Sequence, residues 1–382
     1  MKIAVLLRGQ ARFAELGAQV FNKYVRDRFP QHEFKVYIAT WKSMSLTMST
    51  EQTDPNAVCY GREFHQEILS EEEVAKTIMS WSPARFNIYK EQVLANLVRN
   101  IMLKNQCDSE YIKWIEQTLT ENKKRDGLQL LRPATPLNIF AENLNEAYGR
   151  ILSDQPLILS EGVQALKRQA INIQYMLGQV FSAGKSHDVL QKHIKVDGWE
   201  PDLIWVTRPD WYGWLEHENY FSDMYNFLKR QPEPTIGVDY VSIVRGRPHI
   251  SDYNFYMLPD TAMAALDNID ENIFELLTDD KELSSMLIGS GTSLQHLLWV
   301  LVFRKFALKN LPNTDHSSPR PNNIIRPIPN ITEKTSALLA AEPSKENMIA
   351  YDREMTSYNY PNANTPATPE LIDEIYLKLM TN

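Results

Sequence analysis

The first 41 residues have the pattern of a β-strand, a helix and a second β-strand. An apolar run at residues 2–7 is short enough for one buried strand, and residues 34–41 form another. Between them, the stretch from Ala14 to about Arg28 is predicted to be helical. A strand, a helix and a strand at this spacing form a βαβ unit, whose strands are parallel neighbours. The beginning of the chain therefore predicts an open α/β sheet.

The turn after the first strand has a composition that suits an anion. It reads Arg8-Gly9-Gln10-Ala11-Arg12. Gly9 lets the backbone approach a phosphate closely, while Arg8 and Arg12 supply bidentate donors near the start of the predicted helix. The turn contains neither a G-x-G-x-x-G motif nor a Walker sequence. It is therefore not a dinucleotide fingerprint or a P-loop, and dehydrogenase and kinase functions are poorly supported.

A second apolar run ends in polar residues at Asp202–Asp210. Ligands of open α/β sheets bind beyond the carboxyl ends of the strands, where Arg208 and Asp210 would lie and Pro209 would stiffen the backbone. A surface ion pair that closes the strand is the alternative, because Arg-Pro-Asp is a common turn composition. A helix is predicted over Ser160–Leu190, where apolar residues recur at intervals of three and four. Since that helix precedes the strand, the stretch continues a doubly wound sheet.

The length of 382 residues and these patterns predict one mostly parallel, Rossmann-like sheet that is interrupted by an insertion. We predict the first half of an α/β domain, an all-helical insertion, the second half of the domain, and a tail with a short final helix over Pro369–Met380. The corresponding boundaries are 1–60, 61–155, 156–335 and 336–382. Helices are also predicted at Glu71–Ser80, Tyr89–Leu103, Asp260–Leu266 and Ser293–Leu308.

Three stretches are predicted to be loops. Residues 43–55 are irregular and polar, so a mobile loop is expected above the strand ends, and residues 348–369 have the composition of a polar wrap or linker. Arg304–Lys334 contains six basic and two acidic residues and is expected to be an extended loop. That loop is either solvated or contributes a phosphate contact from Arg320 or Arg326.

Composition excludes several classes of protein. The two cysteines, Cys59 and Cys107, stand at no metal-binding spacing, so neither a disulfide framework nor a thiolate zinc site is expected. No apolar run approaches the length that spans a bilayer, and the first strand is too short for a secretory signal. We therefore expect a cytoplasmic protein without integral membrane contact. The net charge of -8 argues weakly against a protein coated with nucleic acid.

The order of the motifs resembles a broad set of bacterial, viral and phage proteins treated as glycosyltransferases. Those proteins begin with an apolar strand that ends in Arg-Gly-Gln-x-Arg, and they later carry a strand that ends in Thr-Arg-x-Asp. The resemblance covers about half of the chain and leaves out residues 61–150 and the tail. The matching pieces are Arg8–Arg12, Thr40-Trp41, Gln174-Tyr175 with Ser182, Thr207–Asp210 and Ile250–Phe255.

The resemblance implies the GT-A class, whose α/β domain binds a nucleotide-sugar at the strand ends. The usual motif is Asp-x-Asp, and its last carboxylate helps to hold a divalent cation that bridges the two phosphates. Asp210 matches that last position, while Arg208 replaces the first acid. Because an arginine neutralises diphosphate charge directly, manganese or magnesium at Asp210 is either retained with fewer protein ligands or dispensed with. The implied donor-binding residues are Arg8, Gly9, Gln10, Arg12, Arg208 and Asp210.

Transfer of a sugar to a hydroxyl also needs an acceptor for the hydroxyl proton. In an inverting enzyme a carboxylate takes it, and Asp252 is the first candidate by its order along the chain, with His249 second. Asp252 as a cap or turn residue is the alternative, and a retaining enzyme would not need this base. Trp211 and Trp214 near the strand end are either sugar-stacking platforms or ordinary packing residues.

Two acceptors and one different function remain open. The acceptor is either a glycan or a hydroxymethylated base in DNA, as in phage enzymes that glycosylate their genomes, and a phage enzyme would act in the host cytoplasm. A duplex base would need flipping out of the stack. The other function is a non-catalytic nucleotide- or glycan-binding protein, which the missing first acid of the metal motif favours.

Overall fold

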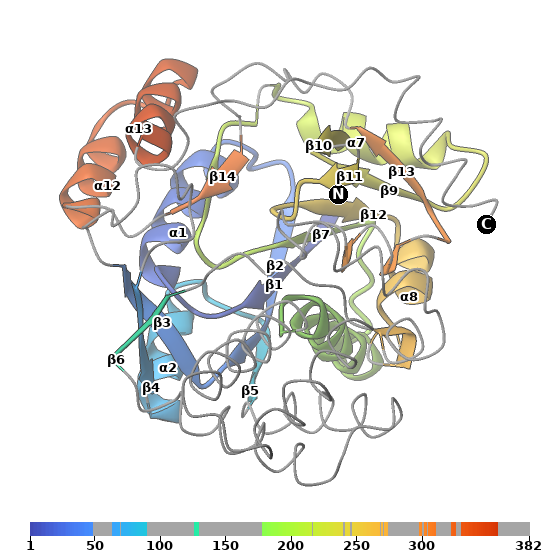
Figure 1. Cartoon of the computed structure of the whole chain (residues 1–382). Coiled ribbons are helices and arrows are strands. Elements are labelled where there is room, and N and C mark those ends of the chain that lie inside the picture. The colour runs from blue at the N-terminus through green and yellow to red at the C-terminus, as the bar shows by residue number, and fades with distance from the viewer. Residues whose placement is uncertain are drawn as a thin grey trace, which may run out of the picture.

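The computed structural model describes residues 1–48, 63–68, 70–89, 126–129, 178–215, 217–239, 241–244, 247–267, 269, 271–273, 298–299, 302–303, 305–310, 322–325 and 330–357. These residues build an α/β structure around a mixed sheet of seven strands (Figure 1). The strand order is β13-β9-β12-β7-β1-β2-β5. The strands are β1 (Lys2–Gly9), β2 (Glu33–Trp41), β5 (Arg85–Tyr89), β7 (Leu203–Thr207), β9 (Thr235–Val238), β12 (Phe255–Met257) and β13 (Ala307–Asn310).

Most strand pairs in this sheet are parallel. β1 pairs with β2 and β7, β2 pairs with β5, and β9 pairs with β13, all in parallel. β12 alone runs the other way, antiparallel to both β7 and β9. The predicted α/β class and mostly parallel sheet are therefore confirmed. The strands also come from both halves of the chain, as expected for one interrupted sheet.

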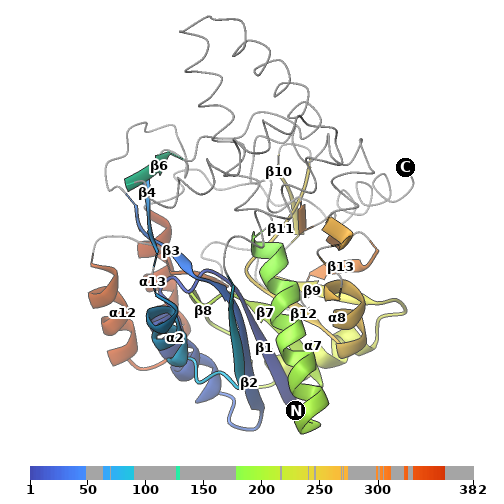
Figure 2. The same ribbon diagram turned by 90° about the horizontal axis from the view of Figure 1, so that it is seen from below.

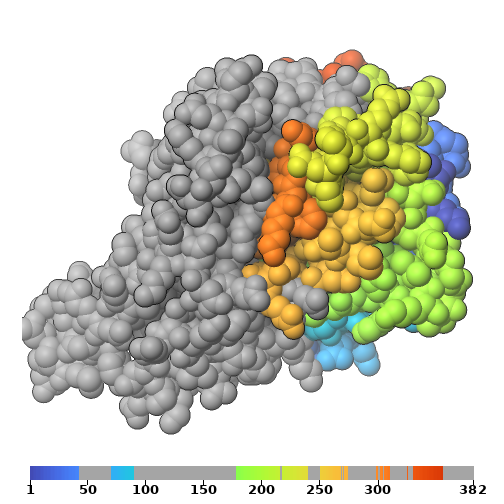
Figure 3. All heavy atoms as spheres, turned by 90° about the vertical axis from the view of Figure 1, so that its right-hand side faces the viewer, coloured from blue at the N-terminus to red at the C-terminus, as the bar shows by residue number. Residues whose placement is uncertain are grey.

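The centre of the sheet is buried because helices cover both faces. Residues 3–7 of β1 and 203–207 of β7 are buried throughout, as near-continuous apolar parallel strands should be. One face packs against α1 (Ala14–Phe21), α2 (Glu71–Met79) and α7 (Tyr220–Lys229) in a single apolar cluster. The helical residues 178–197 cover the other face (Figure 2). On that face Phe181 stacks on Trp41 at 5.7 Å between ring centroids. α8 (Pro259–Leu266) packs near β7. Figure 3 shows the α8 region at the surface beside β13.

The strand order reverses direction at β1. From β1 the chain adds β2 and then β5 on one side, whereas β7 lies on the other side. In open α/β sheets such a reversal opens a crevice at the carboxyl ends of the two strands, where ligands bind. Gly9 pairs with Thr40 and Leu7 with Thr207, so the three strands end at nearly the same level. The turns that follow β1 and β7 are thereby placed next to each other.

The carboxyl-terminal part of the chain packs on α1. β8 (Trp211–Gly213) pairs antiparallel with β14 (Asn322–Ile324), and α12 (Ile331–Ala340) and α13 (Lys345–Ser357) follow. A second apolar cluster joins α12 and α13 to α1 and β8. After α1, a π-helical turn, η1 (Asn22–Arg26), carries the chain on, so the helix predicted from Ala14 continues with a changed hydrogen-bond pattern.

Two small sheets complete the described structure. β3 (Ser43–Met48), β4 (Glu63–Ile68) and β6 (Asp126–Gln129) form one, and β10 (Val241–Val244) and β11 (Arg247–Ile250) form the other. No helix within the described ranges is both long enough and apolar enough to cross a membrane.

The prediction of an all-helical insertion over 61–155 was wrong. Helix Glu71–Ser80 is present as α2, but β4 and β6 are strands, and β5 adds an edge strand to the main sheet. β5 was missed because it is five residues long and follows a helix with a strong period. Most of the helix predicted at Tyr89–Leu103 lies outside the described residues.

Three other predictions also need correction. Residues 43–48 of the predicted loop form β3, whose antiparallel partner β4 begins 15 residues after β3 ends, too far for a local pattern to reveal the pairing. The helix predicted to end at residue 308 gives way to β13, which pairs with β9, and the supposed basic loop contains β13, β14 and the start of α12. Residues 348–357 are helical in α13 because the Pro- and Asn-rich composition begins only after Ser357. The final helix predicted at Pro369–Met380 lies outside the described residues.

Candidate functional site

The turn after β1 is tied to the helical residues 178–197. Gly9 has a φ of +92°, a conformation that favours glycine, and its N–H donates to Ser182 Oγ at 2.8 Å. The Ser182 hydroxyl in turn donates to the Gln179 carbonyl at 3.0 Å. Arg8 Nη1 donates to Gln179 Oε1 at 2.8 Å. The turn is therefore fixed by side chains about 170 positions later in the chain, as their sequence numbers show.

Arg8 is a buried cation, with a relative exposure of only 1%. Its guanidinium carbon lies 4.9 Å from the ring centroid of Trp299 and 5.6 Å from that of Phe255. Aromatic faces attract a desolvated guanidinium, which lowers the cost of burying its charge. A buried positive charge, that of Arg8, therefore lies at the end of β1, where the strand order reverses.

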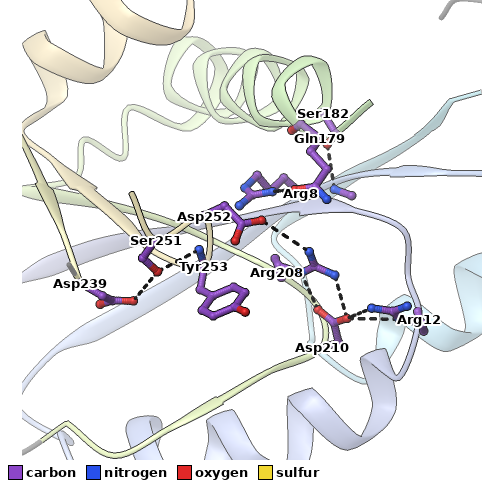
Figure 4. Close-up of polar contacts among 11 residues, drawn as sticks. Arg8, Arg12, Gln179, Ser182, Arg208, Asp210, Asp239, Ser251, Asp252 and Tyr253 are labelled. Atoms are coloured by element: carbon purple, nitrogen blue, oxygen red, sulfur yellow. Dashed lines mark hydrogen bonds and ion pairs between the residues drawn. The ribbon is translucent and has the colours of Figure 1, made fainter. Parts of the chain in front are cut away.

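Asp210 lies between two arginines at the end of β7. Arg208 Nε donates to Oδ1 at 2.8 Å and its Nη2 to Oδ2 at 3.0 Å. Arg12 donates to Oδ2 from Nη2 at 3.0 Å and from Nε at 3.3 Å. Both guanidinium groups thus bind one carboxylate, and Arg12 comes from the turn after β1. The two predicted motifs meet through this carboxylate (Figure 4).

The Asp210 carboxylate stays ionised despite complete burial. Burial on its own would raise the pKa of Asp210, but the charges of Arg208 and Arg12 and their hydrogen bonds outweigh it and lower the pKa. The Arg208 side chain is only 12% exposed and that of Asp210 only 1%. The ion pair of the alternative prediction is therefore present at the end of the strand, but it is largely buried and not at the surface.

Close packing of α1 holds the Arg208–Asp210 turn in place. A Cβ atom added to Gly17 in α1 would lie 2.0 Å from the backbone oxygen of Pro209, a distance no Cβ tolerates. Glycine at this position lets the helix backbone touch the turn directly. The αL conformation of Phe13, with φ at 53°, starts the helix immediately after Arg12.

Asp252 lies on the other side of Arg208. It precedes β12 and is 1% exposed, and its Oδ2 lies 4.0 Å from Arg208 Nη1. Arg208 therefore sits between two carboxylates, one bound through two hydrogen bonds and one at ion-pair distance. The structure places Asp252 beside Arg208, and its role as the base stays a prediction.

A buried network at the same edge was missed by sequence reasoning. Asp239 directly follows β9 and is 6% exposed. Its Oδ2 accepts from Asn254 Nδ2 at 2.6 Å and from Ser251 Oγ at 3.4 Å, while Asn254 Oδ1 accepts from Trp205 Nε1 at 2.8 Å. The signal was present, because Asp239 follows a short apolar strand just as the Arg-Pro-Asp turn does.

The arginines lie at one part of this edge of the sheet, and two further carboxylates, those of Asp239 and Asp252, lie beside them. β9 is parallel to β7, and β12 is antiparallel to both, so the ends of β1, β7 and β9 and the start of β12 lie at one edge. The ends of β1 and β7 carry three arginines and one carboxylate, and the β12 and β9 side carries two carboxylates (Figure 4). An anion is favoured at the β1 and β7 ends, and a hydroxyl that must lose a proton is favoured beside the carboxylates.

Gln10 is partly buried in the turn between Gly9 and Ala11. Trp211 is wholly buried in the core, so the packing alternative holds for it, and Trp214 lies under the Arg28 guanidinium at 3.7 Å from its ring centroid. His249 lies on β11, paired with Ser242. Arg320 and Arg326 lie outside the described residues.

A metal ion at this site would have to share Asp210 with two arginines. No group of three or more His, Cys, Asp or Glu side chains suited to a metal occurs within the residues that the structure describes. Both oxygens of Asp210 already accept hydrogen bonds from arginines, so a cation there would compete with Arg12 and Arg208. A metal at Asp210 stays a prediction from the resemblance.

No protein-family model matches the chain, and no curated protein or solved structure matches it.

Proposed function

We propose that the chain is a glycosyltransferase of the GT-A class that transfers a sugar from a nucleotide-sugar donor to an acceptor hydroxyl. One observation carries the proposal: two arginine-bearing turns, from adjacent parallel strands, meet through Asp210 at the reversal of strand order. That position is where open α/β sheets bind their ligands. Three arginines there offer the donors that phosphate oxygens require.

The proposed role of the arginines is to stabilise the leaving group. When the bond between the anomeric carbon and the phosphate oxygen breaks, negative charge grows on a nucleoside diphosphate. Preorganised cations in a buried site stabilise such a charge more than water does. Arg8 is held by Gln179, and Arg12 and Arg208 are held by Asp210, so all three are oriented before the ligand arrives.

Asp252 is the proposed base of an inverting reaction. The acceptor oxygen would form its bond to the anomeric carbon while the bond to the diphosphate breaks, and the hydroxyl proton would pass to the Asp252 carboxylate. Support comes from the position of Asp252, whose Oδ2 is 4.0 Å from Arg208 Nη1.

Manganese or magnesium belongs to this proposal as an alternative source of positive charge. Asp210 is the residue that would hold it, and the ion would supply additional charge to the diphosphate. Since arginines already surround Asp210, we expect donor binding to persist in the presence of a chelator.

One observation favours a second function, a non-catalytic nucleotide- or glycan-binding protein. Both oxygens of Asp210 are engaged by arginines, and Arg208 replaces the first acid of the metal motif. A binding protein would keep the cationic turns without needing a base at Asp252.

A turnover assay separates the two functions and the two acceptors. Radiolabelled nucleotide-sugars are incubated with the protein and with oligosaccharides, hydroxymethylcytosine DNA or unmodified DNA. We expect transfer to one acceptor class, and a loss of roughly 100-fold or more in Asp252→Asn, the scale of a lost general base. Binding of nucleotide-sugar without transfer or hydrolysis in any mixture would favour the binding protein. A fully active Asp252→Asn would remove Asp252 from the mechanism.

A further inference from the structure

The Arg208–Asp210 turn runs directly into β8, and β14 pairs with β8. Ile324 pairs with Trp211, and Asn323 pairs with Tyr212. The next residue, Ile325, donates its backbone N–H to the Asp210 carbonyl at 2.6 Å. The backbone of the proposed phosphate-binding turn is therefore bound by a segment more than 100 residues later in the chain.

A buried side-chain hydrogen bond fixes β8 from the helical side. The Tyr212 hydroxyl donates to Asp352 Oδ1 at 2.6 Å, and the residues are 0% and 1% exposed. Asp352 lies in α13, and the neighbouring Tyr351 ring meets the Tyr212 ring edge to face at 5.0 Å. Removal of one partner from a buried hydrogen bond costs free energy, because the other group loses that bond away from water.

α12 binds η1, the π-helical continuation of α1, and α1 flanks the turn on its other side. Lys23 Nζ donates to the backbone carbonyls of Leu339 and Ala341 at the end of α12, where a cation complements the helix dipole. The Tyr24 hydroxyl donates to the Leu338 carbonyl at 3.3 Å. α12 thus binds η1, which continues α1, through Lys23 and Tyr24, and α13 binds β8 through Tyr212. The turn lies between α1 and β8.

We propose that Tyr212 and Asp352 are positioning residues that set the orientation of the Arg208–Asp210 turn from α13. Both side chains are buried, and they act through the backbone of β8, which directly follows Asp210. A shift of β8 would move Asp210, and with it the guanidinium groups of Arg208 and Arg12 that Asp210 orients. The effect on phosphate binding rests on the proposed function, whereas the effect on the turn itself does not.

Two isosteric variants and one matched control test this proposal. Tyr212→Phe and Asp352→Asn weaken the buried hydrogen bond and keep the volume of the side chains. Tyr351→Phe is the control, because it removes a hydroxyl bonded to Thr335 Oγ1 at 2.7 Å in the same apolar cluster. All three variants are expected to lower the melting temperature. Only the first two should affect the turn.

The readouts are amide hydrogen exchange at Ile325 and the affinity for inorganic pyrophosphate, measured by calorimetry at low salt. We expect Tyr212→Phe and Asp352→Asn each to speed exchange at Ile325 and weaken pyrophosphate binding roughly tenfold, the scale of one hydrogen bond to a charged group. The double variant should be no worse than either single variant. Tyr351→Phe should keep both properties at the wild-type level.

The exchange measurement separates this proposal from the proposed function. Exchange at Ile325 that is unchanged in Tyr212→Phe would overturn the positioning role, as would equal effects from Tyr351→Phe. A wild-type protein that does not bind pyrophosphate would count against the proposed phosphate site. In that case faster exchange at Ile325 in the two variants would still support positioning of the turn.

Discussion

Asp210 joins the turn after β1 to the turn after β7. Its carboxylate is buried and accepts four hydrogen bonds from Arg12 and Arg208. The two guanidinium groups come from different strands, so a single carboxylate sets the relative position of two turns. Without it, two cations would face each other in a site with little solvent.

The first prediction concerns Asp210→Asn. The variant leaves two nearly buried guanidinium groups without their carboxylate, so the free energy of unfolding at pH 7 should fall by roughly 3 kcal/mol. The folded-state pKa of Asp210 is lowered below its unfolded value of about 3.9. The stabilisation is therefore present above that pH and is lost as pH falls through the folded-state pKa. Urea unfolding at several pH values measures this change.

The matched control is Asp223→Asn, which neutralises an exposed carboxylate on α7. That substitution should change the free energy of unfolding by less than about 0.5 kcal/mol. Equal effects of the two substitutions, or a difference between Asp210→Asn and wild type that does not shrink at acid pH, would contradict the role given to Asp210.

Sequence reasoning found some residues of this site and missed others for a physical reason. Arg8, Arg12 and Arg208 stand at strand ends, and a local pattern is enough to locate such positions. The residues that hold them are remote in sequence, and nothing in the pattern of Gln179 or Ser182 indicates that they bind the first turn. Asp239 could have been found, because it ends a short apolar strand.

At the scale of elements, the contact between α1 and the Arg208–Asp210 turn decides the geometry of the site. α1 begins immediately after Arg12, and Gly17 brings its backbone against Pro209. The helix therefore fixes the distance between the two arginine-bearing turns. A change in that distance would separate Arg12 from Asp210 without altering either residue.

The second prediction concerns Gly17→Ala. Alanine favours a helix over glycine by about 1 kcal/mol, which on its own would stabilise the variant. A Cβ 2.0 Å from a backbone oxygen forces α1 away from the turn, however, and overpacking of this kind costs roughly 1–3 kcal/mol. We expect a net loss of stability in urea unfolding and weaker binding of diphosphates in calorimetry.

Gln19→Ala serves as the control, since Gln19 is exposed on the same helix. It should leave both stability and diphosphate affinity close to wild type. A Gly17→Ala protein that is more stable than wild type and binds diphosphates equally well would show that the helix is free to move away from Pro209.

Sequence patterns predicted the elements that are continuous and buried, and failed where an element depends on a distant partner. β1, β2 and β7 were predicted because each is an apolar run between clear boundaries. β5 and β13 are short edge strands of the main sheet, and pairing with β2 and β9 makes them strands. β12 is three residues long, and its antiparallel direction comes from its place between β7 and β9.

At the scale of the whole molecule, the position of the site follows from the strand order. The order of the strands reverses at β1, where β2 lies on one side and β7 on the other. Arg8, Arg12 and Arg208 lie at the carboxyl ends of β1 and β7. The net charge of the chain is -8, so the arginine cluster is a local reversal of sign. A compact dianion suits such a site better than a long polyanion, because the chain as a whole carries a net negative charge.

The most direct test of the proposed donor site is a calorimetric titration of nucleoside diphosphates and nucleotide-sugars into the wild-type protein, with and without manganese. Arg208→Ala is compared with Arg230→Ala, an exposed arginine that follows α7 and precedes β9, at the opposite edge of the sheet. We predict micromolar to millimolar binding of at least one nucleoside diphosphate, at least tenfold weaker in Arg208→Ala and unchanged in Arg230→Ala. No binding of any nucleotide by the wild type, or equal affinity in Arg208→Ala, would contradict the site.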